Sequence, residues 1–104
     1  AQPKQFQVVL YSVLTLYNPK KSSPLFTGDV YDHYKRMCVN TNLRPLTQRR
    51  VSDILGELDM MGIINARIIS KGRHGRTREI TPSLSSSSRS KVKKILEERL
   101  NIEP

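Results

Sequence analysis

Residues 46–62 read LTQRRVSDILGELDMMG and contain the periodicity that decides the fold. Apolar residues recur there at spacings of three and four, at Val51, Ile54, Leu55, Leu58 and Met61. Such a stripe is typical of an amphipathic helix. Thr47 can cap the first turn, and Leu46 before it can pack against Val51. Gly62 suits a left-handed stop after the last apolar residue, so the stretch predicts a helix with both ends specified.

The charge order of this predicted helix is unusual. Arg49 and Arg50 fall in its first turn, and Glu57 and Asp59 fall near its end. This order opposes the helix dipole, at a cost of about 0.3 to 1 kcal/mol for each exposed cation. Helical geometry places Arg49 and Ser52 away from the stripe and Arg50 on its flank. One interpretation is a solvated helix face, and the other is a recognition helix whose first turn meets a DNA major groove. The predicted contact residues are Thr47, Gln48, Arg49, Arg50 and Ser52.

The composition bounds the class of protein. A chain of 104 residues is expected to form one domain over residues 1–104, too small to hold a separate catalytic domain. The formal net charge of +9 points to a polyanionic partner, with nucleic acid the first candidate. Cys38 is the single cysteine, so neither a disulfide framework nor a zinc cluster is available. These features favour a reducing, cytoplasmic location.

Signals for secretion or membrane insertion are missing from the sequence. The opening AQPKQF has no long apolar core, and no run of 18 apolar residues occurs. We therefore expect a soluble domain with no membrane partner. The start at Ala1, without an initiator methionine, suggests a piece of a longer protein.

Two further helices are predicted before the central one. Residues 3–17 have proline in the first turn and a broad apolar stripe, which indicates a core helix. After a loop over 18–24 and a very short strand at Leu25 and Phe26, residues 27–40 predict a second helix capped by Thr27, with Phe26 packed on Tyr31. Its apolar stripe comprises Val30, Tyr31, Tyr34, Met37 and Cys38. In this helix the acids lie early and the bases late, which favours stability.

After Gly62 the period changes to that of strands. Residues 64–69 alternate as a β-strand, residues 71–76 read KGRHGR, and residues 77–81 supply a second short strand. This predicts a hairpin with a cationic tip that suits phosphate contact or insertion into a narrow minor groove. The alternative is a hairpin tip that is only solubilised by its charges. The predicted contact residues are Lys71, Gly72, Arg73, His74, Gly75, Arg76 and Arg78.

The chain then predicts a loop over residues 82–90 and a last helix with a stripe of Val92, Ile95, Leu96 and Leu100. The resulting order is helix, short strand, helix, helix, strand, basic hairpin, strand, helix. This order is typical of a winged helix-turn-helix domain. The predicted class is thus α+β, a helical core with a small antiparallel β-hairpin wing. Winged helices bind DNA, RNA or proteins, so the site must decide the function.

The residues also carry a family resemblance. Residues 45–80, PLTQRRVSDILGELDMMGIINARIISKGRHGRTREI, resemble the C-terminal winged-helix domain of archaeal replication initiators, and the preceding TGDVYDHYKRMC fits the same domain. The resemblance implies binding of double-stranded origin DNA through the recognition helix and wing. It also implies an ATPase part elsewhere in the longer protein, where ATP or ADP with magnesium would bind, and partners such as a replicative helicase or other initiator copies.

Other chemistry has little support in this chain. No GxxxxGK[ST] phosphate loop and no GxSxG turn occur, so we expect no enzyme activity and no cofactor in residues 1–104. His33, His74 and Cys38 do not form a metal-binding pattern, and we expect His33 on the surface and Cys38 in the core. The alternatives are a winged-helix transcriptional regulator, which would commonly dimerise, and a protein-docking winged helix, for which an outward Met60 is the evidence. We expect the isolated domain to be monomeric.

Overall fold

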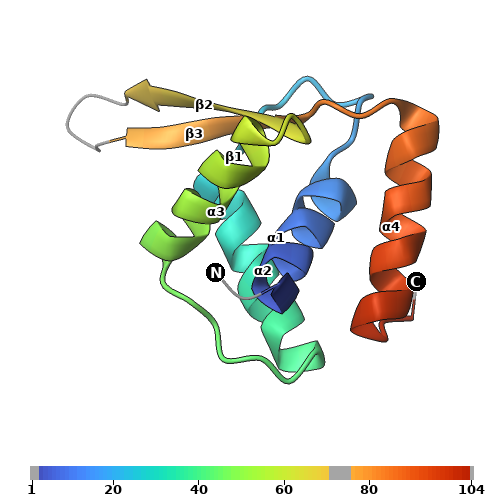
Figure 1. Ribbon diagram of the computed structural model, residues 1–104. Coiled ribbons are helices and arrows are strands. Elements are labelled where there is room, and N and C mark those ends of the chain that lie inside the picture. The colour runs from blue at the N-terminus through green and yellow to red at the C-terminus, as the bar shows by residue number, and fades with distance from the viewer. Residues whose placement is uncertain (1–2, 71–75, 104) are drawn as a thin grey trace.

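The computed structural model describes residues 3–70 and 76–103, which form helices below a small sheet (Figure 1). Its elements, in chain order, are α1 (Pro3–Leu16), β1 (Leu25–Phe26), α2 (Thr27–Asn40), α3 (Gln48–Met60), β2 (Ile64–Ser70), β3 (Arg76–Pro82) and α4 (Ser86–Leu100). The predicted element order is therefore confirmed. None of the described helices combines the length and the apolar content needed to cross a membrane.

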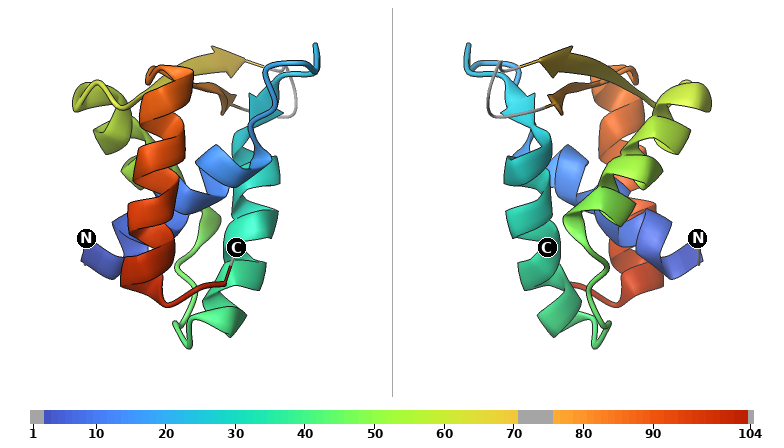
Figure 2. Two further views of the ribbon diagram at one scale, coloured as in Figure 1. Left: turned by 90° about the vertical axis from the view of Figure 1, so that its right-hand side faces the viewer. Right: turned by 90° about the vertical axis from the view of Figure 1, so that its left-hand side faces the viewer.

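Helix α1 is the centre of the hydrophobic core. It crosses between α2 and α4 and also contacts α3, as the two side views show (Figure 2). Val8, Val9 and Val13 have no exposed surface. The hydroxyl of Tyr11 donates to a carboxylate oxygen of Glu97 at 3.0 Å, which joins α1 to α4. The prediction that the first helix belongs to the core is confirmed.

The sheet is antiparallel, with the strand order β1-β3-β2. Ala66 of β2 pairs with Ile80 of β3, and Leu25 of β1 pairs with Ile80 from the other side. Ala66 and Ile80 are 2% exposed, so this end of the sheet closes the core. The other end of the β2–β3 hairpin projects past α3 (Figure 1).

Two apolar residues that the periodicity placed in the core are exposed. Met61 is 64% exposed, because α3 ends at Met60 and the chain turns at Gly62 with φ of +77°. Ile63, beyond that turn, packs on the core in its place. Ile95 is 50% exposed, because α4 covers α1 with a narrow stripe in which Leu96 and Leu100 are buried.

One predicted boundary and one predicted cap are also wrong. The predicted loop over 82–90 is shorter, because the Ser85 hydroxyl accepts from the Ser88 N–H at 3.2 Å and α4 begins at Ser86. Thr27 does not cap α2, since Phe26 is the capping residue and its N–H donates to the Asp29 carboxylate at 2.9 Å. The Thr27 hydroxyl instead accepts from the backbone N–H of Arg78 in β3, at 3.0 Å.

Candidate nucleic-acid interface

The first turn of α3 presents polar and cationic side chains to solvent. The Thr47 hydroxyl accepts from the Arg50 N–H at 3.2 Å, so the predicted cap is confirmed. Gln48, Arg49 and Arg50 are exposed, whereas Val51 is fully buried on the opposite side. A helix start with free cations facing outward offers guanidinium groups to an anionic partner.

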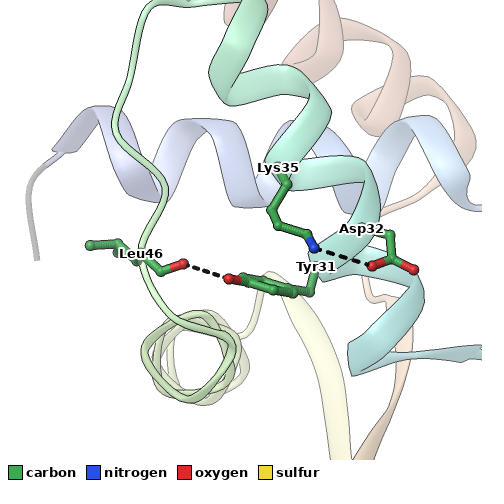
Figure 3. A network of polar contacts seen from close by, with 4 residues as sticks. All are labelled: Tyr31, Asp32, Lys35 and Leu46. Atoms are coloured by element: carbon green, nitrogen blue, oxygen red, sulfur yellow. Dashed lines mark hydrogen bonds and ion pairs between the residues drawn. The ribbon is translucent and has the colours of Figure 1, made fainter.

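Two tyrosines of α2 hold the backbone of the residue that precedes the cap of this helix. The Leu46 N–H donates to the Tyr34 hydroxyl at 2.7 Å. The Tyr31 hydroxyl donates to the Leu46 carbonyl at 2.9 Å, as Figure 3 shows. Leu46 directly precedes the capping Thr47. The point where α3 begins is thus anchored to α2 by hydrogen bonds to both backbone groups of one residue.

Tyr34 extends this anchor to α1. Its hydroxyl donates to Gln5 Oε1 at 2.6 Å, and Gln5 Nε2 donates to the Arg44 carbonyl at 3.1 Å. Tyr34 has no exposed surface, and burial is the main cause that raises its pKa to about 12. The hydroxyl therefore stays protonated and can donate to Gln5 at all ordinary pH values.

Tyr31 is more exposed and lies among charged neighbours. Lys35 Nζ lies 4.9 Å from the centroid of the Tyr31 ring and 3.9 Å from an Asp32 carboxylate oxygen (Figure 3). The Tyr31 and Tyr34 rings stack with their centroids 5.9 Å apart. These contacts restrict the tyrosine that holds the Leu46 carbonyl.

A groove of about 640 Å³ lies between α2, the start of α3 and the first residues of β3. Arg49 of α3 and Arg76 of β3 both line it, which brings the two predicted basic elements to one surface. Three carboxylates, those of Asp29, Asp32 and Asp53, line it as well. Sequence reasoning assigned none of these acids to the site. Carboxylates repel phosphates and can accept from base amino groups, so this surface is electrostatically mixed.

The described part of the hairpin contains fewer free cations than the sequence suggested. Arg76 is exposed, and Arg67 pairs with Glu79 across the strands at 3.3 Å. The predicted contact residues Lys71, Gly72, Arg73, His74 and Gly75 lie outside the described residues.

Arg78 and Ser52 differ from the other predicted contact residues. Ser52, expected to face outward, is half-buried, and its Oγ accepts from Arg78 Nε at 3.1 Å. Arg78 Nη1 donates to the Ala66 carbonyl at 3.2 Å. The guanidinium of Arg78 is therefore directed back toward α3 and β2, because these elements offer it two acceptors.

His33 and Cys38 can be placed apart from this surface. Cys38 is 1% exposed, as predicted for a core cysteine. The prediction of a surface histidine is wrong, because His33 is half-buried and its Nδ1 is buried without a hydrogen-bond partner among the described residues. Burial, followed by the charges of Arg36 and Lys93, lowers its pKa below 6.5. Residues 3–70 and 76–103 contain no group of three or more acidic, histidine or cysteine side chains placed for a metal.

The arrangement defines a winged helix-turn-helix domain, in which α2 and α3 form the helix-turn-helix and the β2–β3 hairpin forms the wing. Residues 1–92 match the family described as "CDC6, C terminal winged helix domain". The chain belongs to this family, the winged-helix domain of replication initiators.

Similar proteins agree with this assignment. The chain is 45% identical over 102 residues to the "ORC1-type DNA replication protein" of Pyrococcus furiosus, covering 98% of this chain and 23% of that protein. It is 54% identical over 78 residues to the protein of the same name from Thermococcus onnurineus, covering 75% of this chain and 19% of that protein. The chain thus spans less than a quarter of the length of these curated relatives.

A solved structure is similar along most of the chain. It is described as the structure of the Aeropyrum pernix ORC1 protein in complex with DNA. The TM-score is 0.76 and the sequence identity is 35%, with 93% of this chain and 24% of that chain covered. The predicted α+β winged-helix class and the predicted family are confirmed.

Proposed function

We propose that this domain binds double-stranded DNA at replication origins, as the DNA-contacting part of a replication initiator. The start of α3 lies in the major groove, and the wing lies in or along the adjacent minor groove. The observation that carries the proposal is the groove lined by both Arg49 and Arg76, which lets two basic elements contact one duplex. The relative from Aeropyrum pernix, whose structure is of a complex with DNA, supports it.

The proposed contacts are divided between the two elements. Thr47, Gln48, Arg49 and Arg50 contact the major groove, and Arg76 contacts phosphates with the wing-tip residues 71–75. The binding of a helicase, of other initiator copies, or of ATP in the rest of the longer protein stays a prediction from the family.

The dependence of affinity on salt tests this proposal. If roughly 4 to 7 phosphates are neutralised, log K should fall against log salt with a slope of about −4 to −6. Fluorescence anisotropy of a labelled duplex, titrated from low to moderate salt, measures the slope. A slope near zero would reject DNA binding and favour protein docking, for which Met60, 90% exposed at the far end of α3, is the supporting observation.

The interface is small for a site-specific binder. A single module buries about 600 to 1,000 Å², so the isolated domain should discriminate weakly between origin and random duplexes. Competition between the two duplexes measures this ratio. A preference of ~10⁴-fold for the origin duplex would show that the domain needs no further part of the longer protein for recognition.

A further inference from the structure

Arg78 connects the three elements that meet behind the candidate interface. Its Nε donates to Ser52 Oγ of α3 at 3.1 Å, and its Nη1 donates to the Ala66 carbonyl of β2 at 3.2 Å. Its backbone N–H donates to Thr27 Oγ1, at the start of α2, at 3.0 Å. One residue of β3 therefore bonds to both helices of the helix-turn-helix and to the other strand of the wing.

Gly56 of α3 provides the space for this side chain. A Cβ at position 56 would lie 3.0 Å from Arg78 Nη2 and 3.3 Å from Arg78 Cζ. Glycine weakens a helix interior relative to alanine, so a glycine at the middle of α3 requires a reason. The guanidinium that lies against Gly56 supplies one. The two residues are matched in shape as well as joined by the neighbouring hydrogen bonds.

We infer that Arg78 is a positioning residue that sets the angle between the wing and α3, and that it does not act mainly through a phosphate. The inference rests on the proposed function in one respect, that both elements contact one duplex. When two contacts are held on one rigid body, the second forms at a high effective concentration once the first has formed. A wing free to change its angle would lose part of this gain.

The substitution of lysine separates the two roles of Arg78. A phosphate contact needs only a positive charge, and lysine provides one as a compact point charge. The position between Ser52 Oγ and the Ala66 carbonyl needs donors in a planar fork, which lysine lacks. Arg78→Lys preserves the net charge, and Arg67→Lys, on the neighbouring strand β2, where the side chain is exposed and pairs with Glu79, is the matched control. Gly56→Ala changes no charge and forces the guanidinium to shift by a few tenths of an ångström.

A distance measurement in the free protein tests the positioning role without DNA. Spin labels at Glu57→Cys on α3 and Ser70→Cys on β2, in a Cys38→Ala background, report the angle of the wing, since both sites are exposed. The distance distribution should be narrow in the unsubstituted chain and in Arg67→Lys, broad in Arg78→Lys, and intermediate in Gly56→Ala. A narrow distribution in both Arg78→Lys and Gly56→Ala would overturn the inference.

DNA affinity provides the second arm of the test. Arg78→Lys should bind a duplex about tenfold more weakly and Gly56→Ala should lose affinity by a smaller factor, whereas Arg67→Lys should change affinity less than about twofold. If Arg78→Lys binds DNA as tightly as the unsubstituted domain, Arg78 acts through phosphate contact instead. If the unsubstituted domain fails to bind DNA, the proposed function fails, and the distance measurement still decides the positioning role. Circular dichroism melts of each variant establish that it is folded.

Discussion

Helices α2 and α3 are consecutive and of similar length, 14 and 13 residues, yet the polar side chains that α2 directs at its neighbours and the arginines in the first turn of α3 serve opposite purposes. In α2 the polar groups bond within the protein: Asp29 holds the Phe26 N–H, and Tyr31 and Tyr34 hold Leu46. In α3 the side chains of Arg49 and Arg50 have no partner among the described residues. The difference separates a helix that positions its neighbour from a helix that is positioned to bind.

The largest effect is expected when the hydrogen bonds that anchor the start of α3 to α2 are removed. Tyr34→Phe removes the hydroxyl that bonds to Leu46 and Gln5 in a fully buried position. Buried groups left without partners should lower the free energy of unfolding by about 2 to 3 kcal/mol. Urea denaturation measures this loss, and Tyr31→Phe, which lies at a half-buried position, should cost less. Equal and negligible losses in both variants would mean that the tyrosines do not anchor α3.

The next prediction concerns Arg49, whose loss should lower DNA affinity without lowering the stability of the fold. Arg49→Ala should weaken binding to the preferred duplex by about 1 to 3 kcal/mol if its guanidinium is bidentate to a guanine, and should relax the preference at one base position. Removing a cation from the first turn of a helix should change the free energy of unfolding by between zero and about +1 kcal/mol. Anisotropy titrations with base-substituted duplexes and parallel melts measure the two effects. Unchanged affinity and base preference would exclude Arg49 from the interface.

Local signals in the sequence predicted most of the fold. The helical period placed Val51, Ile54 and Leu55 in the core, and the structure buries all three. Thr47 as a cap and Gly62 as a left-handed stop were also predicted correctly, because each depends only on residues within one turn. Residues at the end of a stripe, such as Met61, were placed wrongly because periodicity does not report where the core ends.

The long-range polar contacts could not be predicted in this way. Thr27 is 51 residues from Arg78 in sequence and Gln5 is 29 residues from Tyr34, so no local pattern relates them. The inward direction of Arg78 did have one signal in the sequence, the isolated Gly56 inside a helical pattern. Such a glycine costs about 0.5 to 1 kcal/mol relative to alanine and often marks a close approach. The partner that approaches it is visible only in three dimensions.

A smaller effect sharpens the contrast between the first turns of the two helices. Asp29→Asn removes a carboxylate that favours the start of α2, and should cost about 0.3 to 1 kcal/mol of stability. DNA affinity should stay equal or rise by up to about twofold, because Asp29 lines the groove beside Arg49 and repels phosphate. Melts and anisotropy on the same samples test both effects, with Glu98→Gln, an exposed carboxylate on α4 outside the groove, as the control. Weaker DNA binding in a folded Asp29→Asn variant would assign Asp29 a direct contact.

The smallest expected effect concerns pH and again belongs to α2. Burial and the charges of Arg36 and Lys93 lower the pKa of His33 in the folded protein below its unfolded value near 6.5. Between these two pKa values the unfolded chain binds more protons, so stability is full above about pH 6.5 and falls as the pH drops toward the folded pKa.

The variant His33→Gln tests this assignment, because glutamine does not titrate. Urea denaturation between pH 7 and pH 5 should show a small loss of stability in the unsubstituted chain and a smaller loss in His33→Gln, while His74→Gln serves as the matched histidine control. The buried Nδ1 of His33 has no described acceptor, so a proton added there gains no hydrogen bond that would offset its desolvation. If His33→Gln leaves the pH dependence as it was and His74→Gln removes it, the titrating group is His74 and not His33.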